Sequence, residues 1–594
     1  MTLLAGVYSR HSDNPVSDAL CDAIKAALSR YPNEQLQFFR DERCFLVKAD
    51  AGAYGDQAFR IDSSGVSFMV GEPLLAHAQP SRRSRAVDLN ELHNAFARND
   101  SEPLTRARGV FCAAHYRPGS AALTLVTDKL GIRPMYYWLS ERYVIFATAL
   151  RILEDVQDVP KVMDVRGVTE LYSLEYPLSD RTPYSSVSLL KAAEIVRVNG
   201  ESSFRQQYWR WDDIQSSGRP TDELTEDVYR KFVDAVAIRS GTDSTTAAFL
   251  SGGLDSRTIV TALVQRGLRV HTFNFSIIGT QDQVFGAEFA HRLGTTHTER
   301  PLTLDRQVSA KFIADILSAP TDDLNQLAER PALVWSGDGG SVTLGHVYLN
   351  RTIVDLARIG NAEAAVRLFT KAWAGTVPPR LLKSDIRETI SEILHDGLLQ
   401  ELSELRCADA GRAIHLLLML NDQRRHLAQH FEAIDLNRLE YHLPFFDSEF
   451  VAAVLRVPID MCLGHRLYMH LLRRHLPEVV LSVPWQAYPG HEPCPLPIPG
   501  ELTYQWEKKT VSKIRDAKRR DLLAQASQML AASDFPTPLL KRHSVRLAAW
   551  VYRLRMREVG HVIGAAHLYY RYWSRCGGKY LPPVTMPAGG ARGQ

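Results

Sequence analysis

Short apolar runs separated by polar breaks characterise the first third of the chain. Residues 44–47, 66–70, 123–126 and 143–146 are rich in β-branched and aromatic side chains and predict strands. Residues 16–28 have the apolar spacing of a helix. Strands interspersed with helices indicate a layered α+β domain.

The pattern changes in the next segment. Apolar side chains recur every four residues from Leu224 to Val236, which predicts an amphipathic helix packed against a sheet. Residues 245–250 suit a parallel strand covered on both faces, residues 257–266 suit a helix that Gly267 ends, and residues 270–275 suit a second strand. Strands that alternate with helices indicate an α/β region with a parallel sheet.

The polar stretch 212–220 separates the two patterns, so we expect one domain at 1–210 and another at 211–594. The second domain should end in a helical region, from about 501 to 580, with basic patches. Solvated helix faces are the simplest explanation of these patches, and a surface for a peptide or a processing protein is the alternative.

The composition excludes several classes of protein. The 594 residues are 45% hydrophobic and 23% charged, which is typical of globular domains, and a net charge of +3 is too small to indicate nucleic-acid binding. The seven cysteines form no C-x-x-C pair, so neither a disulfide framework nor a zinc site is predicted. We found no apolar run long enough for a signal peptide or a membrane span, and we therefore expect a cytoplasmic protein without membrane contact.

Candidate chemistry begins where the apolar run 245–250 meets Ser251-Gly252-Gly253-Leu254-Asp255-Ser256. Glycines allow backbone N–H groups to approach a phosphate, and the serine hydroxyls and the helix N-terminus add further donors. A carboxylate here would repel phosphate unless a cation lies between them, so Asp255 implies magnesium. The alternative is a tight strand-to-helix turn with no ligand.

This string resembles the pyrophosphate-binding signature of the ATP-pyrophosphatase enzymes, above all the asparagine synthetase-like group. The resemblance implies an adenine-nucleotide α-hydrolase-like fold for the second domain, and cleavage of ATP between its α and β phosphates to activate a carboxylate for an amine. It also implies an ATP site built from Leu250, Ser251, Gly252, Gly253, Asp255, Ser256, Phe275, Ser336 and Gly337. From the residues alone, Leu250 and Phe275 are equally well explained as core.

A second glycine turn, Trp335 to Ser341, resembles the family's Ser-Gly-Glu-Gly-Ser-Asp signature. Asp338 occupies its first acidic position, whereas Ser341 stands where the family carries a magnesium ligand. The resemblance makes Asp338 either a base that deprotonates the attacking amine or, together with Asp255, a metal ligand. An aspartate in a glycine turn can also serve only to form the turn.

The N-terminal domain resembles the glutamine amidotransferase domain of asparagine synthetases at Leu4–Val7, Gly109–Phe111 and Asp128–Tyr137. That domain is Ntn-hydrolase-like and uses an N-terminal cysteine, but Thr2 stands at the matching position. Val70 also replaces the asparagine of the family's Asn-Gly-Glu segment. We therefore expect a degenerate domain that makes no ammonia, although an N-terminal threonine can act as a nucleophile.

Residues 440–447 resemble the family's Glu-x-Arg-x-Pro-Phe-x-Asp segment. Glu440 matches the acid that partners the base in β-lactam synthetases, and Asp447 suits a helix cap. A buried Asp338/Glu440 pair would have one raised pKa, as a general base near neutrality requires.

The loop 483–495 lacks the lysine that stabilises the acyl-AMP transition state in asparagine and β-lactam synthetases, and His491, or else Arg473 or Arg474, is the candidate replacement. Proline and aromatic residues could equally make this loop a rigid lid. The loop, the length of the chain and the degenerate N-terminal domain are similar to those of lasso peptide cyclases. That resemblance implies a macrolactam synthetase that joins an Asp or Glu side chain of a precursor peptide to its N-terminal amine, with ATP, Mg²⁺ and a leader-peptide protease as partners.

Two other functions stay open. One is an asparagine synthetase-like or β-lactam synthetase-like ligase acting on a small substrate, and the other is a nucleotide-binding scaffold without catalysis. The missing cysteine at Thr2 and the missing loop lysine argue against the first, and the intact string 251–256 argues against the second.

Overall fold

The computed structural model describes residues 2–30, 34–50, 52–76, 84–200, 202–301, 333–345, 347–437, 439–486, 490–504 and 514–583. Two compact units are present. The first comprises Met1–Val156, Leu190–Arg351 and Leu418–Thr510, and the second comprises Gln157–Leu189, Thr352–Leu417 and Val511–Gln594. Each unit has a hydrophobic core of its own.

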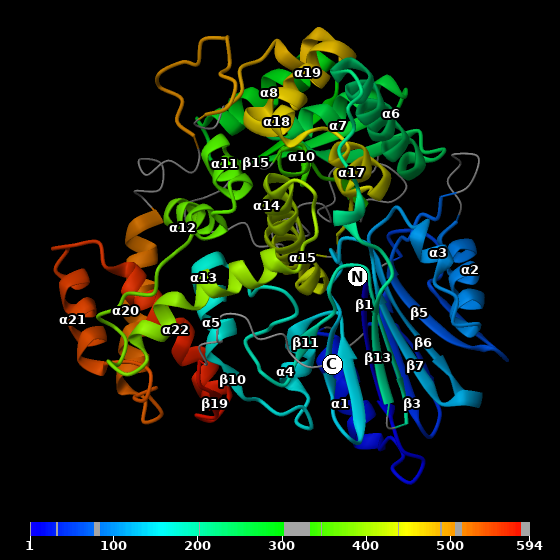
Figure 1. Ribbon diagram of the computed structural model, residues 1–594, viewed down its shortest axis with the longest axis vertical. Helices are drawn as coiled ribbons and strands as arrows, with labels where there is room; N and C mark the ends of the chain where they lie inside the picture. The colour runs from blue at the N-terminus through cyan, green and yellow to red at the C-terminus, as the bar shows by residue number, and fades with distance from the viewer. Residues whose placement is uncertain are drawn as a thin grey trace. The chain divides into compact units, whose positions relative to one another are not determined.

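Two antiparallel sheets pack face to face in the N-terminal part of the first unit (Figure 1). One has neighbouring strands in the order β8 (Tyr136–Leu139), β9 (Tyr143–Ala147), β1 (Thr2–Ser9), β3 (Cys44–Asp50) and β2 (Leu36–Arg40). The other has the order β13 (Ser202–Gln207), β12 (Glu194–Asn199), β7 (Ala122–Thr127), β6 (Phe111–Arg117), β5 (Gly65–Gly71) and β4 (Phe59–Asp62). The inner faces share one apolar core.

Helices cover the outer faces of this sandwich. The first sheet is covered by α1 (Asp18–Leu28) and α4 (Leu150–Asp155), and the second by α2 (Arg85–Ala97). The result is a four-layer αββα domain, so the predicted layered α+β class is confirmed. The four runs predicted as strands lie in β3, β5, β7 and β9, and the predicted helix is α1.

The α/β part of the first unit contains a parallel sheet. Its strand order is β16 (Thr296–Pro301), β15 (Arg269–Ser276), β14 (Thr245–Phe249), β17 (Leu333–Trp335) and β18 (Glu440–His442). Strand β14 is central, so the turns that follow β14 and β17 meet at the same edge, where ligands bind in open parallel sheets. The predicted parallel sheet is confirmed.

Helices flank this sheet. They include α6 (Thr221–Ser240), α7 (Leu254–Gln265), α8 (Gln281–Leu293), α10 (Gly340–Thr343), α15 (Arg424–Glu432), α17 (Ser448–Leu455) and α19 (Arg466–His475). The apolar stripe of α6 is buried as predicted, but it packs mainly on α17 and α19. Helix α7 begins three residues earlier than predicted, which places Asp255 and Ser256 in its first turn, and Gly267 follows it with a φ of 82°.

The second unit is mainly helical, as predicted for the C-terminal region. It contains α5 (Val165–Leu174), α12 (Ala362–Trp373), α13 (Arg387–Ser403), α20 (Ile514–Ala531), α21 (Arg542–Arg553) and α22 (Gly560–Arg575), with β10 (Met163–Asp164) paired to β19 (Tyr580–Leu581). Helices α20, α21 and α22 pack on one another. Among the helices described in either unit, none is long and apolar enough to cross a membrane.

Candidate active site

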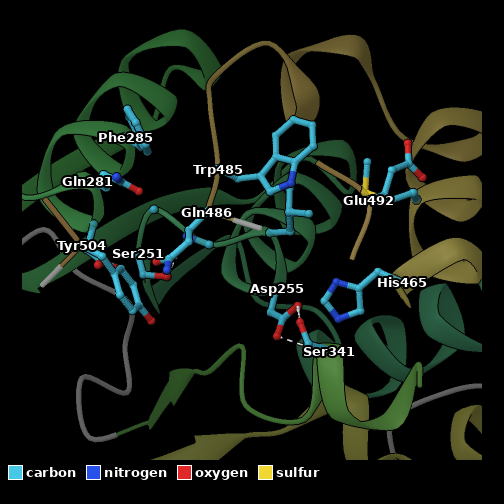
Figure 2. A pocket seen from close by; sticks show the side chains of 15 residues that line it. Ser251, Asp255, Gln281, Phe285, Ser341, His465, Trp485, Gln486, Glu492 and Tyr504 are labelled. Carbon is cyan, nitrogen blue, oxygen red and sulfur yellow. Dashed lines mark hydrogen bonds between the residues drawn. The ribbon is translucent and has the colours of Figure 1, made fainter. Parts of the chain in front are cut away.

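A pocket opens beside the turns that follow β14 and β17 (Figure 2). Four parts of the chain line it. They are the loop 251–255, the N-terminal turns of α8, Ser341 of the second glycine turn, and side chains from the segment 465–504. The predicted phosphate loop therefore faces a cavity, as a nucleotide-binding loop must.

The two serines of this loop hold its shape. The hydroxyl of Ser256 accepts a hydrogen bond from the backbone N–H of Ser251 at 3.1 Å, and the two hydroxyls lie 3.2 Å apart. A side chain at Gly252 would place its Cβ 2.8 Å from the carbonyl oxygen of Gln281, so the loop can lie against α8 only because glycine stands there. Hydrogen bonds within the loop and its close contact with α8 thus fix the loop conformation.

Asp255 is tied to the second glycine turn. Its carboxylate accepts hydrogen bonds from the backbone N–H and the hydroxyl of Ser341, both at 2.9 Å (Figure 2). A Cβ at Gly340 would lie 2.5 Å from Cγ of Asp255, and one at Gly337 would lie 2.8 Å from the N of Ser256. The glycines of both turns are therefore required for the close approach of the two loops.

Burial raises the pKa of Asp255; hydrogen bonds from Ser341 and Tyr468 partly offset this shift, and the charge of Asp338 adds a smaller contribution to it. Asp338 itself accepts a 2.6 Å hydrogen bond from the hydroxyl of Ser336 within its own turn. A cation near both carboxylates would offset their mutual repulsion. Within the described residues, however, no group of three or more His, Cys, Asp or Glu side chains could hold a metal ion alone.

Magnesium fits this donor set only if phosphate oxygens and water complete its coordination, as is usual for Mg²⁺ in ATP-using enzymes. Asp255 would be the main protein ligand, with Asp338 as the second. Ser341, at the position where the resemblance led us to expect a metal ligand, instead fixes the orientation of the Asp255 carboxylate.

The structure places His465, rather than His491, at the pocket. His465 lines the cavity and has a left-handed backbone conformation with a φ of 62°. The ring of His491 packs edge-on against it with centroids 4.4 Å apart, and burial lowers the pKa of His465 to about 3. Residues 487–489 of the predicted loop lie outside the described residues.

The two arginines considered as replacements for the lysine form ion pairs. Arg473 pairs with Glu492, and Arg474 pairs with Asp222 at 2.8 Å. Glu492 lines the pocket, so Arg473 lies behind a lining residue. No lysine contributes to the pocket lining in the part of the chain that the structure describes.

Several lining residues were missed by the sequence reasoning. Two buried amide oxygens, Oε1 of Gln281 and Oε1 of Gln486, have no hydrogen-bond partner among the described residues. Such acceptors can receive hydrogen bonds from a ligand. The sequence could have indicated Gln281, because this residue begins the helix after the second predicted strand. No local sequence pattern indicates that Gln486 or His465 lines the pocket.

Leu250 and Phe275 lie in apolar surroundings. Leu250 is 1% exposed, and the ring of Phe275 packs edge-on against that of Phe249 with centroids 5.7 Å apart. Phe275 is partly buried and packs against the core cluster of the parallel sheet. Neither side chain lines the described part of the pocket, so the structure favours the core explanation that the sequence left open.

Glu440 lies at the start of β18, opposite Leu333. Its carboxylate accepts a 2.5 Å hydrogen bond from Arg133 and a 3.3 Å hydrogen bond from the hydroxyl of Tyr54. Burial alone would raise its pKa, but the charge of Arg133 and further hydrogen bonds lower the pKa overall. The expectation of an Asp338/Glu440 pair with one raised pKa is corrected for Glu440, because its partners belong to the N-terminal domain.

Thr2 lies within a buried network of charged side chains. It is 1% exposed, and its hydroxyl is 3.5 Å from the carboxylate of Asp50. Asp50 also accepts hydrogen bonds from Lys48 at 2.6 Å and Arg85 at 2.7 Å. Charged side chains therefore surround the position where a glutaminase would need an accessible nucleophile.

Two family models match parts of the chain that contain the sandwich and the phosphate loop. The model of the glutamine amidotransferase domain matches residues 76–209, and the model of asparagine synthase matches residues 227–323.

Three relatives are asparagine synthetases by name. A putative asparagine synthetase (glutamine-hydrolyzing) 2 of Methanocaldococcus jannaschii is 26% identical over 251 residues, which cover 39% of this chain and 48% of the relative. Asparagine synthetase (glutamine-hydrolyzing) 3 of Bacillus subtilis is 24% identical over 453 residues, 69% of this chain and 72% of the relative. A putative asparagine synthetase (glutamine-hydrolyzing) of Mycobacterium tuberculosis is 23% identical over 481 residues, 71% of this chain and 73% of the relative.

The match to the archaeal relative spans about half of that protein's length. A solved structure of the allosteric regulatory enzyme of purine biosynthesis aligns with a TM-score of 0.24 and 9% identity over 64% of this chain and 81% of its own, which is too low for a comparison of folds. The family models and the sequence relatives support an asparagine synthetase-like protein of the ATP-dependent carbon–nitrogen ligase class.

Proposed function

We propose that this protein is an ATP-dependent macrolactam synthetase, as lasso peptide cyclases are. It would adenylate an Asp or Glu side chain of a precursor peptide and join it to the peptide's N-terminal α-amine. The observation that carries the proposal is that the phosphate loop shares its cavity with large apolar side chains, Phe285, Met469 and Trp485. A peptide segment would pack on these apolar side chains while the phosphates of ATP lie against the loop.

The chemistry would proceed in two displacements. A carboxylate oxygen of the peptide attacks the α-phosphorus of ATP, the bond to the β-phosphate breaks, and pyrophosphate leaves along the loop 251–256. The amine nitrogen then attacks the acyl carbon, loses a proton, and AMP departs. Bound magnesium would screen the phosphate charge, held by Asp255; Asp338 would be a second ligand in the alternative in which it does not serve as the base.

The amine needs little help from a base. A peptide α-amine has a pKa near ~7.8, so a useful fraction is neutral at cytoplasmic pH. Asp338 is the proposed proton acceptor, and His465 or His491 is the proposed hydrogen-bond donor to the developing charge in place of the missing lysine. Holding amine and acyl-AMP together can contribute up to ~7–11 kcal/mol of the barrier.

The buried surroundings of Thr2 support an amine that comes from the substrate, because they argue against glutamine hydrolysis as a source of ammonia. We propose a cytoplasmic protein that works with a precursor peptide and its leader-peptide protease. Neither nucleic acid nor a membrane has a part in this proposal.

The test is mass spectrometry of a candidate core peptide incubated with the protein, the leader protease, ATP and magnesium. We expect the peptide to lose one water while AMP and pyrophosphate form. Asp255→Asn should abolish both, whereas Asp22→Asn, at a carboxylate that is 73% exposed on α1, should change neither. AMP formation without loss of water from the peptide would overturn the choice of substrate.

The second candidate is an asparagine synthetase-like or β-lactam synthetase-like ligase that acts on a small carboxylate, and the names of the relatives favour it. It predicts AMP formation with aspartate or a small amino acid and an added amine, in the absence of any peptide. If no carboxylate supports ATP consumption, the third reading, a nucleotide-binding scaffold, takes precedence.

A further inference from the structure

A buried arginine joins the phosphate loop to the wall of the pocket. Arg257 follows the loop directly, in the first turns of α7, and its side chain is fully buried. One end nitrogen, Nη2, donates to the carbonyl oxygens of Gly252 at 2.8 Å and Pro484 at 2.6 Å. The other, Nη1, donates to the carbonyl oxygen of Val483 at 2.8 Å and lies 3.4 Å from that of Val480.

The charge of Arg257 has an unusual environment. No carboxylate forms an ion pair with it within the described residues, and the guanidinium lies 5.3 Å from the ring centre of Phe289. Burial lowers its pKa to about 9. A buried cation is costly unless it is hydrogen-bonded or paired, so these carbonyls carry the stabilisation that an acid usually provides.

The segment 480–484, to which Arg257 is hydrogen-bonded, leads directly into one wall of the pocket. Trp485 and Gln486 follow Val483 and Pro484 directly, and both line the cavity together with Gly252. A planar guanidinium with several donors can bond two backbone segments at once, which a lysine ammonium does less well. Arg257 therefore ties the wall segment directly to the phosphate loop at Gly252.

We propose that Arg257 is a positioning residue that couples occupancy of the phosphate loop to the placement of Trp485 and Gln486 against the acyl substrate. This inference rests on the proposed function and adds a residue that the phosphate-site motif does not assign. Phosphate groups bound at the loop fix Gly252, and Arg257 transmits this restraint to the carbonyls at residues 480–484. The uncompensated positive charge beside the loop also favours a bound triphosphate or pyrophosphate.

The chain offers a matched control. Arg292 on α8 donates to the carbonyl oxygen of Ser482 at 2.9 Å, in the same segment, but its side chain is 43% exposed and pairs with Glu288. Arg292→Met therefore removes a hydrogen bond to the wall segment without touching Gly252 or a buried charge.

The experiment is hydrogen–deuterium exchange of the full-length protein with and without magnesium-ATP or pyrophosphate, with no peptide added. In the wild type, we expect ligand to slow exchange both at 251–256 and at 480–486. In Arg257→Met, ATP should bind about ten- to a hundredfold more weakly, and at saturation only 251–256 should be protected. Arg257→Lys should restore part of the protection at 480–486, and Arg292→Met should behave as the wild type.

Each outcome has a clear meaning. Ligand-dependent protection of 480–486 that persists in Arg257→Met, or that disappears in Arg292→Met, would overturn the coupling. If Arg257→Met does not fold, as judged by near-ultraviolet circular dichroism, Arg257→Lys decides, since a wild-type response in it would also overturn the coupling. A wild type that gains no protection anywhere with ATP or pyrophosphate would refute the proposed function instead.

Discussion

Ser341 donates two hydrogen bonds to the carboxylate of Asp255, one from its backbone N–H and one from its hydroxyl, each 2.9 Å long. The residue that departs from the expected metal-binding pattern is thus the residue that orients Asp255, the proposed metal ligand. This relationship leads to a prediction about the role of the cation.

Ser341→Asp should create a site that depends on magnesium. The new carboxylate would face that of Asp255, so repulsion should destabilise the protein by about 1–3 kcal/mol in the presence of a chelator. Magnesium should reverse the loss, because a divalent cation between two carboxylates removes the repulsion. Denaturant unfolding with and without magnesium measures the effect. Ser341→Ala, which loses one hydrogen bond, should cost about 1 kcal/mol with no response to magnesium.

Glu440→Gln should weaken folding more than nucleotide binding. The change leaves Arg133 as a buried charge without its acid partner, at a cost of about 3–5 kcal/mol in unfolding free energy. ATP affinity of the folded protein should stay within about twofold of wild type, because Glu440 does not line the described pocket. Glu449→Gln, at a partly exposed pair with Lys231, should cost less than about 1 kcal/mol. Full stability combined with lost ligase activity would instead restore a catalytic role for Glu440.

Thr2→Cys should not create a glutaminase. The side chain at this position is buried beside Asp50, so a thiol there would lack access to glutamine. Glutamate release, followed by an enzyme-coupled assay, should stay at the background level for wild type and variant alike. Thr2→Ser serves as the control for changes in folding. Glutamine-dependent release by Thr2→Cys alone would show that a working glutaminase pocket survives.

Lys48→Met should change how stability depends on pH. Burial lowers the pKa of Lys48 from 10.5 to about 7, with the neighbouring charge of Arg85 adding to the shift. Between about pH 7 and 10.5 the unfolded chain then binds more protons at this residue than the folded protein, so this group makes unfolding free energy rise with pH. The slope from one group is at most about 1.4 kcal/mol per pH unit.

The variant should therefore show a smaller rise in stability between pH 7 and 9.5 than the wild type, measured by denaturant unfolding at each pH. Lys231→Met, at a partly exposed ion pair, should leave the slope unchanged. Equal slopes for Lys48→Met and wild type would mean that Lys48 stays protonated throughout this range in the folded protein.

Local features of the chain could be predicted from the sequence. The string 251–256 combines an apolar strand, glycines and a helix start, all of which act through the backbone within a few residues. The turn after Trp335 has the same local character. These two motifs were sufficient to predict a parallel sheet with a phosphate loop at its carboxyl edge.

Partners that are distant in the sequence could not be predicted. Glu440 lies more than 300 positions from Arg133, and the two meet only because β18 joins the edge of the parallel sheet. His465 comes to the pocket through a left-handed turn that no pattern of apolar residues encodes. In both cases tertiary packing determines which groups the side chain contacts. A motif in the sequence identifies the residue but not its contacts.

The contact between Arg133 and Glu440 bears on why the N-terminal sandwich is retained beside the parallel sheet. Glu440 lies on β18, the edge strand of the parallel sheet, and its counter-ion Arg133 belongs to the N-terminal sandwich. A protein without the sandwich would therefore contain the Glu440 carboxylate without its counter-ion. The parallel-sheet part then needs the sandwich in order to fold in soluble form. A fragment that starts at residue 211 should accordingly be recovered in inclusion bodies.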